Sequence, residues 1–161
     1  MKRIAILAAV ALSFMLMTEV TFAGPRFAVI HMTANHNKMK YPGVDCVGTI
    51  TLETLPSRQM EQVTWVIRNG NALNQDDVCP GLDKSMVSLH FDDAVMGATN
   101  TVLTAQHIPV LGTTVWAIRG TIDPGVPDMT HHKYTVFYKG VQAGPDPEIE
   151  VGCDSCGGGG H

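Results

Sequence analysis

The feature that most constrains this chain is a series of short apolar–polar alternations separated by Gly, Pro, Asn and Asp. The clearest is Gln62–Asn69, in which Val63, Trp65 and Ile67 share one face of an extended strand. Trp65 is the largest apolar side chain available to a core. No window has a helical period over the length of a helix. We therefore expect an all-β fold, an antiparallel β-sandwich of seven to eight strands.

The expected strands share this alternation and end at turn-forming residues. They cover residues 26–32, 47–55, 62–69, 85–92, 99–106, 113–119, 132–138 and 147–151. Two of them echo each other, because residues 65–68 read Trp-Val-Ile-Arg and residues 116–119 read Trp-Ala-Ile-Arg. A duplicated half-sandwich or a chance likeness between two amphipathic strands would both produce this echo.

Residues 1–23 have the layout of a secretory signal peptide. Lys2 and Arg3 precede an apolar run over residues 4–17, and Ala23 is a small residue suited to cleavage. The run is short for a membrane anchor, and Glu19 follows it. We expect a secreted or periplasmic protein with no membrane span after cleavage. Its β-sandwich domain would cover 24–152, and a flexible Cys- and Gly-rich tail would cover 153–161.

The balance of charge argues against nucleic acid as a partner. The chain has 11 Lys and Arg and 15 Asp and Glu, of which Lys2, Arg3 and Glu19 fall in the leader. Nine basic and fourteen acidic residues remain, a formal charge of −5. No run of Lys or Arg is present to neutralise phosphates or an anionic membrane surface.

The four cysteines all lie after the leader, and an even number in an exported chain favours disulfides. The simplest pairing is Cys46 with Cys79 and Cys153 with Cys156. The first bridge would brace Gln62–Asn69 from both sides and stabilise the fold by about 3–4 kcal/mol. Cys153 and Cys156 have three interpretations: a disulfide staple, metal ligands joined by His161, or a redox dithiol.

Two patches of Met and His suggest a metal site, because thioether and imidazole ligands suit Cu(I) in an oxidising compartment. The first patch comprises His31, Met32, His36 and Met39, and the second comprises Met129, His131 and His132. The simpler interpretation places Met32 in the core and the others in loops. A copper ion is thus the candidate cofactor of an alternative function. His90 and His107 are expected at the surface, on a strand and in a loop respectively.

The C-terminal strands carry a resemblance to known families. Residues 132–136, Gly140 and residues 146–151 resemble the closing hairpin of exported cupredoxin-like and immunoglobulin-like β-sandwich proteins. The resemblance implies such a fold and leaves the function open. Electron-transfer cupredoxins carry Cys, His and usually Met between their last two strands. Residues 138–148 contain none of these, so a blue-copper centre of that build is not expected.

Three common catalytic motifs are absent: Gly-x-Ser-x-Gly, His-Glu-x-x-His and a phosphate-binding Gly loop. We therefore expect a non-enzymatic binding or structural module whose partner the sequence does not identify. The alternative is a periplasmic copper-binding protein that uses the Met and His loops or the C-terminal Cys pair. A small hydrolase or thiol oxidoreductase is the third hypothesis.

Overall fold

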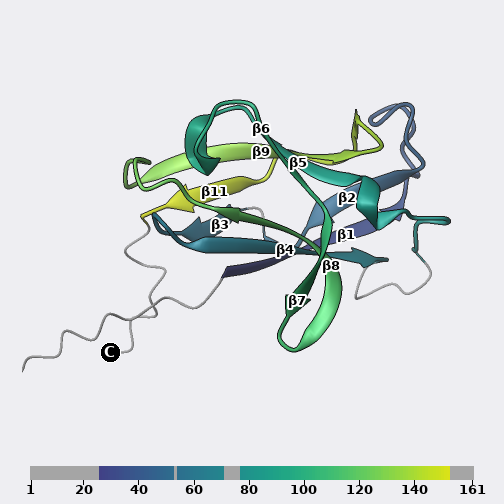
Figure 1. Cartoon of the computed structure of the whole chain (residues 1–161). Coiled ribbons are helices and arrows are strands. Elements are labelled where there is room, and N and C mark those ends of the chain that lie inside the picture. The colour runs from purple at the N-terminus through teal and green to yellow at the C-terminus, as the bar shows by residue number, and fades with distance from the viewer. Residues whose placement is uncertain (1–25, 53, 71–76, 153–161) are drawn as a thin grey trace, which may run out of the picture.

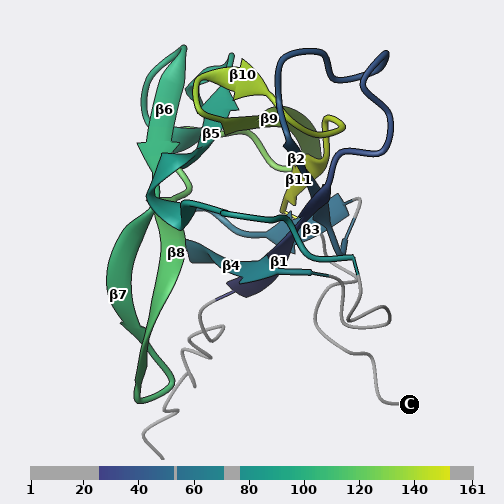
Figure 2. The same cartoon turned by 90° about the vertical axis from the view of Figure 1, so that its right-hand side faces the viewer.

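The computed structural model describes residues 26–52, 54–70 and 77–152, and these form two β-sheets packed face to face (Figures 1 and 2). The first sheet has the strand order β2-β1-β4-β8-β7. The second has the order β3-β11-β9-β5-β6, with β10 paired to β9. The predicted all-β sandwich is therefore confirmed.

The elements are β1 (Arg26–Ala34), β2 (Cys46–Ile50), β3 (Thr54–Ser57), β4 (Gln62–Asn69), the 3-10 helix η1 (Lys84–Met86), β5 (Val87–Phe91), η2 (Ala94–Met96), β6 (Thr101–Thr104), β7 (Gln106–Val110), β8 (Thr113–Thr121), β9 (Thr130–Tyr138), β10 (Val141–Gln142) and β11 (Glu148–Val151).

The strand count and the pairing differ from the expectation in two ways. The described residues form eleven strands, because the expected strands at 47–55 and 99–106 each break and continue in the opposite sheet, and because the short strand β10 was not expected. In addition, β1 pairs with β4 in parallel, and β3 pairs with β11 in parallel, where a wholly antiparallel fold was expected. Parallel neighbours need long connections, and here other strands of the sandwich provide them.

The core is centred on Trp65, which is fully buried between the two sheets. Its ring centroid lies 5.6 Å from that of Tyr134 on β9 and 6.0 Å from that of Phe91 on β5. The indole Nε1–H donates a hydrogen bond to the Tyr134 hydroxyl at 3.1 Å. This bond satisfies the one polar atom of the indole, so Trp65 joins the sheets without leaving its donor unpaired.

A disulfide joins Cys46, the first residue of β2, to Cys79 in the segment that follows β4. The two Cα atoms lie 5.5 Å apart, and both cysteines are buried. The Asn69 side chain also bonds to both the backbone N–H and the carbonyl of Cys79, at 2.8 and 3.1 Å. The predicted brace around Gln62–Asn69 is thus present. Cys153 and Cys156 lie outside the described residues.

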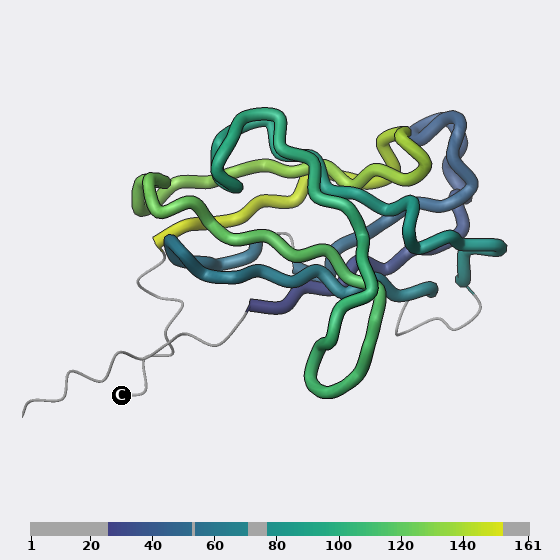
Figure 3. Tube along the Cα trace, in the orientation of Figure 1, coloured from purple at the N-terminus to yellow at the C-terminus, as the bar shows by residue number. Residues whose placement is uncertain are grey.

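The β7–β8 hairpin projects from the sandwich. In Figures 1, 2 and 3 its tip points away from the layer of β9, β5 and β6. Its two-residue loop is Leu111-Gly112, with φ of 48° and 81°. Positive φ at both positions is the geometry of a type I′ turn, whose twist matches that of paired strands. Leu111 is 89% exposed at this tip.

Candidate functional site

The first Met/His patch does not converge on one point. His31 and Met32 are consecutive on β1, so their side chains point to opposite faces of the sheet. Met32 is fully buried, as the simpler interpretation expected, whereas His31 Nδ1 lies 3.0 Å from the Gly70 carbonyl oxygen. His36 Nε2 pairs with Asp77 Oδ1 at 2.9 Å, and Met39 is 96% exposed.

The second patch is divided in the same way. Met129 is exposed, and His131 and His132 point to opposite faces of β9. His131 Nδ1 lies 3.3 Å from Glu148 Oε2. His132 is largely enclosed, with its Nδ1 2.6 Å from Asp93 Oδ2 and its Nε2 2.7 Å from Thr130 Oγ1.

Copper binding by the two patches stays a prediction. The first patch lies on β1 and in the segment after it, and the second lies on β9 and just before it, in the other sheet. Among the described residues, no group of three or more His, Cys, Asp or Glu side chains is placed to hold a metal ion. Metal binding by Cys153, Cys156 and His161 stays a prediction, because these residues lie outside the described ranges.

The Asp93–His132–Thr130 chain has the order of a carboxylate, an imidazole and a hydroxyl. Such a chain activates a nucleophile only if the hydroxyl gives its proton to the imidazole. Here the Thr130 hydroxyl donates to the Pro127 carbonyl oxygen at 2.7 Å, and a carbonyl only accepts. Asp93 also caps η2 by accepting a hydrogen bond from the Val95 N–H. The chain therefore fastens the start of β9 to η2.

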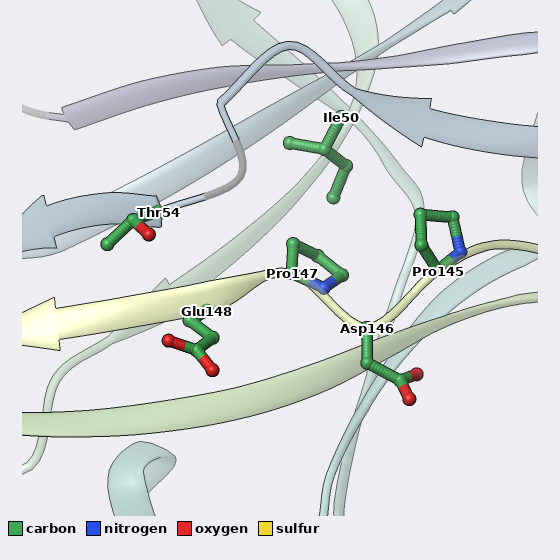
Figure 4. A pocket seen from close by; sticks show the side chains of 6 residues that line it. All are labelled: Ile50, Thr54, Pro145, Asp146, Pro147 and Glu148. Atoms are coloured by element: carbon green, nitrogen blue, oxygen red, sulfur yellow. The ribbon is translucent and has the colours of Figure 1, made fainter.

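A hollow of about 340 Å³, which we name the Ile50 hollow, opens between the end of β2 and the start of β11 (Figure 4). It is lined by Ile50, Thr54, Pro145, Asp146, Pro147 and Glu148. Figure 4 shows both carboxylates directed away from Ile50.

The carboxylates of the Ile50 hollow already have partners. Asp146 Oδ1 accepts a hydrogen bond from the Thr135 hydroxyl at 2.8 Å. Glu148 lies between His131, at 3.3 Å, and Lys133, at 4.0 Å. A ligand in this hollow would therefore meet carboxylates that are already engaged, together with the apolar surface of Ile50 and the two prolines.

A second depression, about 310 Å³ in volume, lies at the base of the β7–β8 hairpin. We name it the Trp116 groove. It is lined by Val66, Ile67, Arg68, Lys84, His107, Thr114, Val115 and Trp116. These residues come from β4, η1, β7 and β8, four elements that are separate in the sequence.

The register explains why Trp116 lies in this groove. Trp65 pairs with Ile118, and Trp116 pairs with His107. Since side chains alternate along a strand, Ile67, Trp116 and His107 share the sheet face that carries Trp65. In the hairpin this apolar face extends beyond the second sheet. The end of the face forms one wall of the groove.

The indole of Trp116 is half-buried and packs against the edge of the core. The His107 ring lies over it, with centroids 4.0 Å apart and planes inclined at 52°. His107 is exposed as predicted, but it lies on strand β7 and not in a loop. Pro109 stands within β7, and Pro is tolerated there because β7 is an edge strand.

Two basic residues, Arg68 and Lys84, line the groove, and no acidic residue is among its described lining. Arg68 follows Ile67 on β4, so its side chain leaves the sheet on the face opposite to Trp116. Asp83, which precedes Lys84, has its carboxylate engaged with the N–H and hydroxyl of Ser85, and these bonds lower its pKa. Arg26, Lys38 and Lys133, by contrast, each have a carboxylate partner.

Sequence reasoning did not identify this groove. Its residues have no motif spacing, and only the fold brings Arg68 and Lys84 beside the hairpin. The one available signal was Trp116, a large aromatic residue on a strand that ends in a short turn.

Comparisons with known proteins give the chain no family. No protein-family model matches it, and no curated protein matches it. Among solved structures, it is similar to the reduced Cu(I) form at pH 4 of a mutant of amicyanin, with 14% identity over 80% of this chain and 82% of that one. The TM-score is 0.36, so this likeness carries no argument about family or function, and the β-sandwich rests on the strand pairing described above.

Where the structure describes the chain, no helix has the length and apolarity needed to cross a membrane.

Proposed function

We propose that this chain is an exported, non-enzymatic binding module that holds a small ligand in the Trp116 groove. The observation that carries the proposal is the half-buried indole of Trp116 in a hollow whose lining also includes apolar residues of β4 and β8, Arg68 and Lys84. Small-molecule sites are usually concave and mostly apolar, with a few polar groups that fix orientation. A volume of about 310 Å³ lies at the lower end of the range such sites occupy.

A binding role agrees with the arrangement of the remaining polar groups. The carboxylates of the Ile50 hollow are occupied by neighbouring side chains. The Thr130 hydroxyl donates a hydrogen bond to the Pro127 carbonyl oxygen, an arrangement that does not activate it as a nucleophile. These two sites therefore offer less support for catalysis than the Trp116 groove offers for binding.

Export is supported by two independent features. Residues 1–23 have the composition of a signal peptide. The Cys46–Cys79 disulfide is of the kind that persists in oxidising compartments.

The proposal is tested by titrating residues 24–161, labelled with ¹⁵N, with four single-ring probes: phenyl phosphate, benzoate, benzyl alcohol and benzylamine. At least one probe is expected to shift the Trp116 indole N–H signal and the amides of β7 and β8. Trp116→Ala should abolish those shifts, and Ile50→Ala in the other hollow should leave them unchanged. Shifts confined to the Ile50 hollow, or absent for all four probes, would contradict the proposed function.

A further inference from the structure

We propose that the β7–β8 hairpin docks on a lipid surface, with its uncharged tip inserted into a bilayer of zwitterionic lipid. This role is separate from ligand binding in the Trp116 groove, because the groove lies at the base of the hairpin and the inserted part is its tip. Four properties of the hairpin support it: the absence of charge, the exposed and strained tip, the backbone hydrogen bonds and the position of the tryptophan.

The hairpin has no charged side chain on either face. Residues 94–118 are the longest stretch of the chain without Asp, Glu, Lys or Arg, and they include all of β7 and the first part of β8. Register and alternation divide the apolar side chains between the two faces, with Ile108, Val110 and Val115 on one and Pro109 and Trp116 on the other. A protein partner usually covers one face of a hairpin, whereas lipid surrounds an inserted one. Because a charged side chain is costly inside a bilayer, the absence of charge from both faces favours lipid.

Leu111 occupies the tip at a double cost. Its side chain is 89% exposed, and its φ is 48°. The first position of a type I′ turn usually holds Asn, Asp or Gly, because other side chains disfavour positive φ. Strain that is retained at one residue points to a function at that residue. Insertion among acyl chains would remove the exposed apolar surface of Leu111 from water.

Backbone groups near the tip already have partners or are missing, which matters because unpaired N–H and C=O groups are costly in lipid. The two-residue turn pairs Val110 with Thr113, so Pro109 is the residue nearest the tip whose backbone faces outward from this edge strand. Pro109 has no N–H, and its carbonyl oxygen accepts a hydrogen bond from Arg119 Nη2 at 3.3 Å. The Thr113 hydroxyl donates to the Val110 carbonyl oxygen, also at 3.3 Å. These bonds lower the cost of moving the tip from water into lipid.

Trp116 lies where an interfacial anchor would be needed. It is five residues from Leu111 along β8, a separation of about 15 Å in an extended strand. Its indole is half-buried. If Leu111 lies among the acyl chains, the indole lies near the level of the headgroups, where Trp is enriched in membrane proteins.

The charge of the chain indicates the class of lipid. The nine basic and fourteen acidic residues that follow the leader give a formal charge of −5, which an anionic membrane surface would repel. The uncharged hairpin gains nothing from an anionic headgroup. Phosphatidylcholine, whose headgroup is zwitterionic, is therefore the expected lipid.

The deciding experiment mixes residues 24–161, without the apolar leader, with phosphatidylcholine vesicles and sediments the vesicles. The protein is expected to sediment with them, and binding should not increase with added phosphatidylglycerol or fall in high salt. Leu111→Trp places a fluorophore at the tip. Lipids brominated on their acyl chains should quench this variant more strongly than they quench the wild type.

Substitution of the tip by asparagine separates lipid binding from folding. Leu111→Asn should weaken partitioning into phosphatidylcholine by about tenfold, because it removes the inserted side chain. The variant should unfold at a urea concentration no lower than the wild type, since Asn-Gly favours the type I′ turn.

Met60→Asn is the matched control. Met60 also has a positive φ, of 62°, and its side chain is 73% exposed. It precedes β4, whose first residue pairs with Thr121 at the end of β8 opposite the hairpin tip. Met60→Asn should therefore leave partitioning unchanged.

The outcomes distinguish lipid from other occupants of the tip. Absence of binding to phosphatidylcholine would overturn the proposal, and so would binding that requires phosphatidylglycerol and disappears in high salt. Equal weakening by Met60→Asn and Leu111→Asn would show that binding does not use the hairpin. If sedimentation velocity finds a wild-type dimer without lipid and a monomer for Leu111→Asn, the tip is a contact between two copies of the chain and the lipid assignment fails.

Discussion

Trp65 and Trp116 occupy similar stretches of sequence and have different roles. Both are followed by Ile and Arg at the same spacing, and both lie on neighbouring antiparallel strands, β4 and β8. The register places both indoles on the same face of the first sheet. Trp65 is fully buried, whereas Trp116 is half-buried in a groove.

The difference lies in what covers that face. Phe91 and Tyr134 of the second sheet enclose Trp65, with ring centroids 6.0 and 5.6 Å away. Trp116 lies where the β7–β8 hairpin of the first sheet extends beyond the cover of the second sheet. Its aromatic neighbour is therefore the exposed His107. Local sequence thus determines that each indole faces one side of a sheet, and the opposite layer determines whether that side becomes core or binding surface.

The sharpest test of this comparison truncates each indole in turn. Trp65→Ala should lower the free energy of unfolding by about 3–5 kcal/mol, because it leaves a cavity and an unpaired Tyr134 hydroxyl. Trp116→Ala should lower it by less than about 1.5 kcal/mol, because its site is already open to water. Urea titrations followed by far-UV circular dichroism measure both losses. Equal losses would show that Trp116 belongs to the core.

Removing the disulfide should destabilise the fold around Trp65 and leave binding in the Trp116 groove unchanged. The double variant Cys46→Ser with Cys79→Ser should lose about 3–4 kcal/mol of stability, as expected for a bridge that closes a loop of this length. The bridge braces β2 and the segment after β4, and neither cysteine is among the residues that line the Trp116 groove. Affinity for the groove probes should therefore be unchanged at temperatures where the variant is folded. Loss of binding in that folded variant would show that the groove depends on the bridge.

Alkaline pH should affect the core around Trp65 and leave Trp116 unaffected. Burial raises the pKa of Tyr134 to about 12, and the hydrogen bond from Trp65 opposes this shift. An unfolded tyrosine titrates near pH 10. The folded state therefore favours the neutral phenol, and this stability is complete below about pH 10 and is lost as pH rises towards 12, by about 2–3 kcal/mol.

Tyr134→Phe serves as the control for that alkaline loss. It removes the ionisable group, so the decline in stability between about pH 10 and 12 should flatten. Thermal unfolding at several pH values measures this directly. An identical decline in the variant would assign the alkaline loss to other groups.

Alternation along the chain was sufficient to predict the strands, the burial of Trp65 and the bracing cysteines, because each depends on local pattern or on pairing an even number of thiols. The parallel pairing of β1 with β4 was not predictable in this way. A strand has the same alternation in either direction, and only contacts between distant segments select its neighbour. The breaks within 47–55 and 99–106 were missed because each strand changes sheet without a strong turn signal.

The candidate site was less predictable than the fold. The histidines and methionines suggested a copper site because imidazole and thioether groups are copper ligands. Adjacent residues on β1 and on β9, however, point to opposite faces of their sheets. Arg68, Lys84 and Trp116 have no recognisable spacing, since three separate elements bring them together. A site of this kind is identified from the part of a sheet that the opposite sheet leaves uncovered, and no sequence motif marks it.

The position of β11 has a consequence for how the chain folds. This strand lies between β3 and β9. It pairs Glu148 with Thr54, two residues that are far apart in the sequence. The second sheet is therefore incomplete until residues 148–151 have docked, and β3 has no partner in that sheet before then. Topologies dominated by such distant pairings fold on timescales of about milliseconds to seconds, and early strands expose unpaired edges while they wait. The sandwich can therefore be completed only when nearly the whole chain is available. Until then, the open edges of β3 and β9 are the surfaces that a chaperone would need to protect.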